Sequence, residues 1–311
     1  MKLSTALLLT GVLAVVVVPV LAKERRAKPE KFGMNSFRGL FFDDLSTVVD
    51  PSRPDVKALR GIKPGGGKST TVEEESDEQS SGQWKKLASA QSIEDEIKRQ
   101  KLLFDSEVAQ PGPFKSGGYV NARNELSIMA TLFSVVSMFE GDIRWKEESV
   151  AARNLLARSA GNCNSGDIAV YKECTTRKQD LDDLLSGSSI SSPPAADESR
   201  WSMIADRSIL MDYLDSLSNK HLPDLTNTDD GVKDSPERVK QFSDMVALVG
   251  HILTQEGMDD ADDEEYAKLS KQMRDAAILV GEAAMRGDAD GARKGVGAIN
   301  QSCDACHEQY R

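Results

Sequence analysis

The sequence predicts an all-α protein made of two antiparallel four-helix-bundle-like units in tandem, preceded by a signal peptide and a flexible linker. Three observations predict this fold. From residue 83 onward, apolar residues recur at intervals of three and four, which is helical spacing. The links between these stretches are short, and the alternating β-branched runs typical of strands are missing. Finally, Trp84-Lys85-Lys86-Leu87-Ala88 resembles Trp201-Ser202-Met203-Ile204-Ala205, which indicates a repeated plan.

Residues 1–22 have the pattern of a secretory signal peptide. Lys2 is followed by an almost unbroken apolar run that ends at Ala22. We expect cleavage there and export across the inner membrane, to the periplasm or beyond. An uncleaved N-terminal anchor is the alternative, because basic residues such as Lys23 and Arg25 follow the run and positive charge is translocated poorly.

Residues 23–82 are expected to form a flexible, low-complexity linker. Pro64-Gly65-Gly66-Gly67 is followed by small polar residues and then by the acidic run Glu73-Glu74-Glu75. So few apolar side chains cannot offset the entropy of ordering the chain.

Residues 83–190 are predicted to form the first bundle. The segment that starts near Trp84 is followed by three predicted helices, 119–140, 143–160 and 167–185. A Ser- and Pro-rich stretch, 186–196, marks the end of this unit. Cys163 and Cys174 lie in it, and we expect a disulfide because free thiols tend to be oxidised after export. Such a bond would add roughly 2–4 kcal/mol; two buried unpaired thiols are the alternative.

Residues 197–311 are predicted to form the second bundle. Its helices are expected at 197–222, 235–257, 262–286 and 288–311, each with one apolar stripe. Ser235-Pro236 is a typical helix start, with a capping residue followed by proline. Four two-faced helices joined by short links bury their stripes against one another as a bundle.

The motif Cys303-Asp304-Ala305-Cys306-His307 carries the chemistry. Two thiols one helical turn apart can each add to a vinyl group of one porphyrin, and the adjacent imidazole can then reach the iron. A thioredoxin-like redox pair would need a preceding strand, and a zinc site would need a second pair of ligands. The motif therefore predicts one covalently bound haem c.

The last nine residues, from Cys303 to Arg311, resemble the C-terminus of the cytochrome c prime family, the class II c-type cytochromes. The resemblance implies a four-helix bundle whose fourth helix binds haem near the chain end. It implies that Cys303 and Cys306 form the thioethers and that His307 is the proximal iron ligand. Arg311 matches a basic residue that lies near the haem propionates.

Arg207-x-x-x-Met211 resembles an Arg-x-x-x-Met pair in the first helix of the same family. By this resemblance Arg207 belongs to the haem site, and Met211 is either the sixth iron ligand or a neighbour of an open sixth position. A core methionine with no iron bond is the alternative. Family members are often dimers, which implies a homodimer.

The first bundle is expected to be a haem-free copy. If Trp84 is aligned with Trp201, Ala90 stands where Arg207 does and Glu94 where Met211 does, and no haem motif follows. We expect this copy to serve packing, dimer formation or docking. Two histidines remain outside the motif. His221 is predicted to be solvated, and His251, which is off the apolar stripe of its helix, to lie at the surface or on the flank; a distal iron ligand is the alternative for His251.

The sequence therefore predicts an exported electron carrier. Removing residues 1–22 lowers the formal charge from −11 to −12, because Lys2 is the only charged side chain lost. Such a surface repels nucleic acid and favours a redox partner with a basic docking surface. Binding of nitric oxide or carbon monoxide at an open distal site is the alternative function, and a structural or docking haem module is a third. We do not expect an enzyme, because no second catalytic constellation stands out.

Overall fold

All of the regular elements in the part of the chain that the structure describes are helices or helical turns. The structure, a computed structural model, describes residues 83–190, 200–204 and 206–310. These residues contain no strand, so the predicted all-α fold is confirmed there. The expected signal peptide (1–22) and linker (23–82) lie outside the described residues, as does Arg311.

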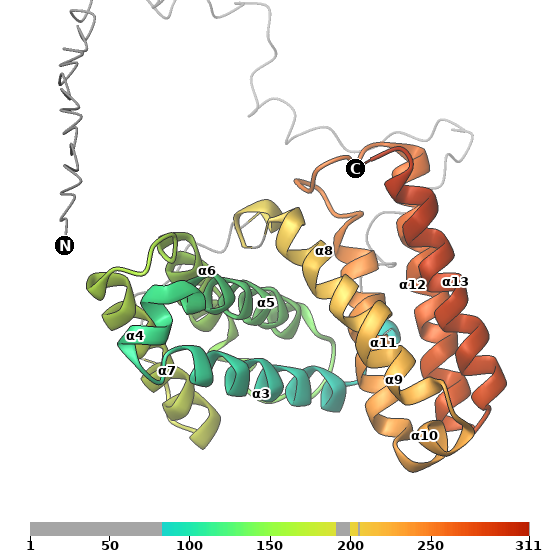
Figure 1. The fold of residues 1–311 in the computed structure, drawn as a ribbon, viewed down its shortest axis with the longest axis horizontal. Helices are drawn as coiled ribbons and strands as arrows, with labels where there is room; N and C mark the ends of the chain where they lie inside the picture. The colour runs from blue at the N-terminus through green and yellow to red at the C-terminus, as the bar shows by residue number, and fades with distance from the viewer. Residues whose placement is uncertain (1–82, 191–199, 205, 311) are drawn as a thin grey trace, which may run out of the picture. The chain divides into compact units, whose positions relative to one another are not determined.

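The first set of elements lies within residues 83–190 (Figure 1). Its elements are α2 (Gln83–Leu87), α3 (Ala90–Glu107), α4 (Pro111–Pro113), the π-helical turn η3 (Phe114–Gly118), α5 (Tyr119–Met138), α6 (Ser149–Asn162) and α7 (Ile168–Ser186). The helix α5 packs against both α3 and α6 and is the central element of this set. Phe104 of α3, Phe114 of η3 and Phe133 of α5 are completely buried in its core.

The predicted helix over 143–160 begins later than expected. In the structure α6 starts at Ser149. Gly141 and Trp145 have positive φ angles of 139° and 62°, which interrupt a right-handed helix. Ile143 and Trp145 are nevertheless buried. Ile143 and Trp145 are apolar because they pack in a buried loop. The sequence interpretation assigned these apolar residues to a helix.

The second set of elements lies within residues 200–310 (Figure 1). Its elements are the 3-10 turn η4 (Trp201–Met203), α8 (Arg207–Ser216), the π-helical turn η5 (Leu217–His221), α9 (Leu222–Thr226), α10 (Asp229–Asp234), α11 (Pro236–Ile252), α12 (Glu264–Met285) and α13 (Ala289–His307). The helix α11 packs against α12, and α12 packs against α13. Three of the four helices predicted for this part therefore lie close to their expected positions.

The remaining predicted helix, expected over 197–222, corresponds to α8 and begins only at Arg207. Asp206 accepts a hydrogen bond from the backbone N–H of Ile209 and so caps the start of α8. Trp201 belongs to the separate turn η4. Ala90 opens α3 in the same way, directly after the capping residue Ser89.

Close approach of α12 and α13 depends on glycine. A Cβ atom added to Gly295 of α13 would lie 2.5 Å from Cγ2 of Val280 on α12. That contact is shorter than van der Waals packing allows, so a larger residue at position 295 would push the two helices apart. This close packing places the C-terminal end of α13 against α12.

The two sets of helices are in contact through buried polar groups. The described residues from 83 onward belong to one compact unit, in which α3 packs on α11 and α5 on α8. The carboxylate of Glu96 on α3 is fully buried and accepts hydrogen bonds from Tyr213 on α8 (2.7 Å) and Gln241 on α11 (2.9 Å). The rings of Trp84 and Trp201 pack with centroids 5.8 Å apart. The division at residues 190–197 into two domains stays a prediction.

Within the described residues, no helix has the length and apolar character needed to span a membrane.

Candidate haem site

The helix α13 carries the motif in its last two turns. Asp288 accepts a hydrogen bond from the backbone N–H of Gly291 and caps the start of the helix. Cys303 and Cys306 are three residues apart, so they share one face, and both are partly buried against the core. His307 is the last residue of the helix and is exposed. The chain therefore presents two thiols and an imidazole together at one end of α13.

A cleft of about 720 Å³ opens beside these three side chains. Pockets of about 300–1,000 Å³ are typical of small-molecule and cofactor sites. Arg207 and Met211 of α8 line the same cleft as Cys303, Cys306 and His307. The structure thus brings together every site residue that the sequence predicted for the haem, apart from Arg311, which lies outside the described residues.

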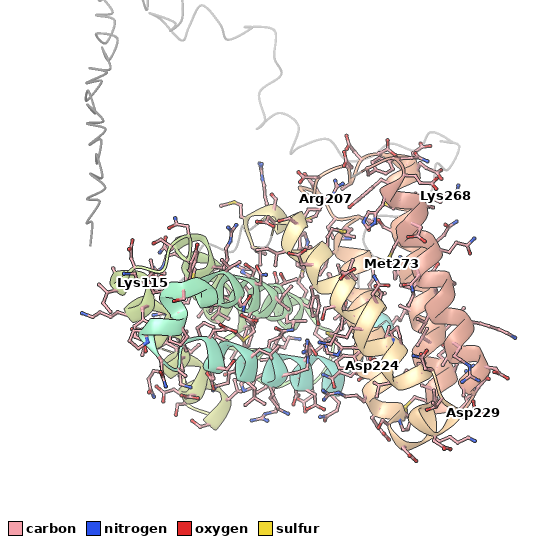
Figure 2. The ribbon with its side chains drawn as sticks, viewed as in Figure 1. Lys115, Arg207, Asp224, Asp229, Lys268 and Met273 are labelled. Atoms are coloured by element: carbon pink, nitrogen blue, oxygen red, sulfur yellow. The ribbon has the colours of Figure 1, made fainter. Side chains whose placement is uncertain are left out.

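The rest of the cleft wall combines apolar side chains from α8, α12 and the segment after α11 with polar and acidic ones, some of them from η5 and α13. Its larger apolar side chains include Leu214, Leu253, Tyr266, Leu269 and Met273. Met273 was not predicted as a site residue, yet its Sδ atom lies 3.7 Å from Sγ of Cys303. Arg207 and Met273, labelled in Figure 2, come from different helices and both face this cleft.

The two motif thiols are held in their neutral form. Burial, followed by the neighbouring Cys306, raises the pKa of Cys303 to about 11. Burial also raises the pKa of Cys306 above its usual value. A thioredoxin-like redox pair needs the opposite, a thiol whose pKa is lowered. The electrostatics of the site therefore disfavour a redox dithiol and agree with thiols that are consumed in thioether bonds.

Arg207 links α8 to Tyr310 near the C-terminus. Its Nη2 atom donates to the carbonyl oxygen of Tyr310 (2.7 Å), and its Nη1 atom pairs with Asp260. The guanidinium lies 5.1 Å from the ring centroid of Tyr266. The positive charge of Arg207 is thus fixed at the wall of the cleft.

Two tyrosines lie at the same end of the cleft. The rings of Tyr266 and Tyr310 meet edge to face with centroids 5.2 Å apart. The Tyr310 hydroxyl donates to Asp263 (2.6 Å), and this hydrogen bond raises the pKa of Tyr310 to about 12. Tyr266 and Met273 are both buried residues of α12, within the helix predicted over 262–286. A stripe alone does not tell which of its residues face a cleft and which face the core.

The predictions for the two remaining histidines were wrong. His251 is only 5% exposed, because the edge of Trp84 covers it at a centroid distance of 5.0 Å. His221 is partly buried and stacks on Phe242 at 4.9 Å. Both errors have one cause: a helical stripe indicates a single buried face, whereas His251 is also covered by Trp84 of α2 and His221 by Phe242 of α11. Neither histidine lines the cleft.

Cys163 and Cys174 are adjacent but not bonded in the structure. Both are buried, and their Sγ atoms lie 3.7 Å apart, compared with about 2.05 Å in a disulfide. The Cys163 thiol donates to the carbonyl oxygen of Tyr119 (3.1 Å). The expected pairing of these two residues is therefore spatially correct, and the bond itself stays a prediction.

Comparison with known proteins agrees with this site. Residues 261–311 match the family model described as cytochrome C'. No curated protein and no solved structure matches the chain. The matched segment contains α12, α13 and the haem motif, whereas Arg207 and Met211 lie before it. The resemblance noted in the last nine residues is therefore confirmed: the C-terminal part of this chain matches the cytochrome c' family over residues 261–311, and this match supports a haem-binding c-type cytochrome.

Proposed function

We propose that this protein is an exported one-electron carrier that holds one haem c covalently through Cys303 and Cys306, with His307 as the proximal iron ligand. One observation carries the proposal. Both thiols, the imidazole and the methionine of the Arg-x-x-x-Met pair line a single cleft of about 720 Å³. These residues come from α8 and α13, which are far apart in the sequence, and they converge on one cleft of the size of a cofactor site.

The donors and the wall of the cleft fit a haem. Neutral thiols on one helical face can form two thioethers, and a histidine at the next position can ligate the iron. Leu214, Leu253 and Leu269 offer apolar surface to the porphyrin and exclude water from it. The haem would supply reversible one-electron chemistry at its iron. The chain would hold it, orient it and set its surroundings.

Met211 decides between two functions. As a sixth ligand it would close the distal position and favour electron transfer. If Met211 only packs in the wall, an open position beside apolar side chains would favour binding of nitric oxide or carbon monoxide. We propose electron transfer as the function, with Met211, which lines the same cleft as His307, as the sixth ligand.

The surroundings of the cleft support a cationic redox partner. Asp212, Asp215, Asp259 and Asp304 line it, and Arg207 is the only Lys or Arg among its described lining residues. We propose a partner protein with a basic docking surface, no nucleic acid partner, and membrane contact only through an uncleaved N-terminus. The helices before residue 191 are proposed to be a haem-free copy that serves packing, docking or a homodimer.

The test is the visible spectrum of the protein made in a host that exports and attaches haem. Wild type should carry one haem that remains bound after denaturation. Cys303→Ala and Cys306→Ala should each lose at least one of the two covalent links, and the double variant should lose all covalent haem. The matched control is Cys163→Ala with Cys174→Ala, which should leave haem content unchanged. Wild-type protein without covalent haem would overturn the proposal.

A second measurement separates the two haem functions. A low-spin ferrous spectrum that carbon monoxide does not change indicates a sixth protein ligand. Met211→Leu should then become high-spin and bind carbon monoxide. If the wild-type ferrous protein is already high-spin and binds carbon monoxide, gas binding replaces electron transfer as the function.

A further inference from the structure

Tyr266 has a buried hydroxyl without a partner. The side chain is only 1% exposed, and its Oη atom makes no hydrogen bond to any other described residue. Buried polar groups are almost always satisfied by protein, water or a ligand, because an unmade hydrogen bond costs free energy. Tyr266 also lines the cleft, so the missing partner can come from whatever occupies it.

One cation lies near Tyr266. The charged and titratable groups that act on its hydroxyl are Arg207 from α8, Asp259 and Asp260 from the loop before α12, and Cys306 from α13. Asp260 is already paired with Arg207. The Arg207 guanidinium lies 5.1 Å from the Tyr266 ring centroid and provides fixed positive charge beside the hydroxyl.

We propose that Tyr266 positions the haem by donating a hydrogen bond from its hydroxyl to a propionate carboxylate. This inference rests on the proposed function. The carboxylates are the strong hydrogen-bond acceptors at the edge of a haem, and a hydrogen bond to a charged acceptor is stronger than one to a neutral group. Arg207 lies beside Tyr266, so the Tyr266 hydroxyl and the Arg207 guanidinium would both contact one propionate.

The two tyrosine hydroxyls at the cleft differ in their hydrogen bonding. Tyr310 lies against Tyr266, but its hydroxyl already donates to Asp263 at 2.6 Å. The two tyrosines therefore differ in one respect that matters here: one hydroxyl is engaged by the protein and the other is free for the ligand. This difference makes Tyr310→Phe the matched control for Tyr266→Phe.

The experiment compares the haem-loaded wild type, Tyr266→Phe and Tyr310→Phe. Resonance Raman spectroscopy reports the bending mode of the haem propionates, which depends on hydrogen bonding to the carboxylate. The band should shift in Tyr266→Phe and stay unchanged in Tyr310→Phe. The midpoint potential of Tyr266→Phe should fall, because a less neutralised carboxylate stabilises the ferric state.

Haem content separates the failure of this inference from failure of the proposed function. Wild type without covalent haem contradicts the proposed function. Loaded Tyr266→Phe with an unchanged propionate band contradicts the role of Tyr266 alone, even if its potential differs. A second measurement needs no variant: uniform replacement of tyrosine by 3-fluorotyrosine makes the hydroxyl a stronger donor. The band should then shift in the sense opposite to Tyr266→Phe, and an unchanged band overturns the inference.

Discussion

His251 shows how burial sets the charge of a single side chain. Its imidazole lies against Trp84, and its Nδ1 atom has no hydrogen-bond partner among the described residues. Burial, followed by the nearby Arg274 and Lys271, lowers the pKa of His251 to about 4. The unfolded chain has a histidine pKa near 6.5. The folded state therefore favours neutral His251, and this contribution is present above pH 6.5 and is lost as the pH falls towards 4.

We predict that His251→Leu makes stability less sensitive to acid. The free energy of unfolding of wild type should fall between pH 6.5 and pH 4, by up to about 3 kcal/mol from this one group at about 1.4 kcal/mol per tenfold difference in proton affinity. The variant should lack this part of the fall. Urea unfolding followed by circular dichroism at several pH values measures it. Parallel pH profiles for variant and wild type would contradict the prediction.

Glu125 is the opposite case, an acid that is stabilised in its neutral form. Burial, followed by the negative charge of Glu107, raises its pKa to about 8. Its Oε2 atom has no hydrogen-bond partner among the described residues. Because the folded-state pKa lies above the unfolded one, the contribution of Glu125 is present below pH 4.5 and is lost as the pH rises through 8.

We predict that Glu125→Gln stabilises the protein at pH 8.5 by on the order of 2 kcal/mol, since an unpaired buried carboxylate is removed. At pH 5 the two proteins should differ little. Glu107→Gln should reproduce part of the effect, because it removes the neighbouring charge and lowers the pKa of Glu125. Denaturant unfolding at both pH values tests this, and equal differences at pH 5 and pH 8.5 would exclude titration of Glu125 as the cause.

At the scale of helices, Glu96 links α3 to α8 and α11. Its fully buried carboxylate accepts hydrogen bonds from Arg99, Gln100, Tyr213 and Gln241. A buried charge is tolerated only when its hydrogen bonds are complete. Tyr213 and Gln241, which donate from α8 and α11, therefore support the packing of α3 on the second set of helices.

We predict that Tyr213→Phe lowers the free energy of unfolding by about 1–3 kcal/mol, because one oxygen of Glu96 loses a donor in a buried site. Tyr119→Phe, a tyrosine outside this network, is the control and should cost less. In a double-mutant cycle, Tyr213→Phe should cost much less in the background of Glu96→Leu. Additive effects of the two changes would show that the hydroxyl and the carboxylate are not coupled.

The adjacent thiols of Cys163 and Cys174 lie at the junction of α6 and α7. Cys163 follows the last residue of α6, and Cys174 is in the second turn of α7. Their Sγ atoms are 3.7 Å apart. An exported thiol–disulfide oxidoreductase can join two thiols at this separation. The enzyme takes up the two electrons, and the two thiols release two protons. Closing so short a loop adds about 3 kcal/mol.

We predict that the exported protein contains this disulfide. In the haem-loaded protein Cys303 and Cys306 are bound in thioethers. Denatured wild type should therefore have no titratable thiol before reduction and two titratable thiols after reduction. Reductant should lower its melting temperature but leave that of the Cys163→Ser, Cys174→Ser double variant unchanged. Two free thiols in the unreduced protein would leave the alternative, a buried dithiol.

Across the whole molecule, sequence reasoning succeeds where the signal is local. The haem motif is contiguous, and α11, α12 and α13 each carry their own apolar stripe and start signal, so they could be placed to within a few residues. Burial that depends on a distant element could not be predicted. Trp84 is remote from His251 in the sequence, yet it decides the environment of that histidine. The free hydroxyl of Tyr266 depends in the same way on where Asp263 and Tyr310 lie.

The charge of the molecule has consequences for its redox partners. The chain has a formal charge of −11, and four exposed aspartates line the cleft: Asp212, Asp215, Asp259 and Asp304. Negative charge at the mouth of a redox site attracts cationic reagents and repels anionic ones. Salt screens both effects, since the Debye length is about 10 Å at 0.1 M ionic strength.

We predict opposite salt dependences for two oxidants of the reduced haem protein. Oxidation by a hexaammine complex of ruthenium(III), a cation, should slow as ionic strength rises, and oxidation by ferricyanide, an anion, should accelerate. The double variant Asp215→Asn, Asp304→Asn should slow the cationic reagent about three- to tenfold at low salt and have a smaller effect at high salt. Asp142→Asn, an exposed aspartate before α6, changes the net charge but not the cleft. If the change in stopped-flow rate per removed charge is the same in Asp142→Asn and in the double variant, net charge causes the steering. A change confined to the double variant assigns the steering to the mouth of the cleft, where a basic partner would have to dock.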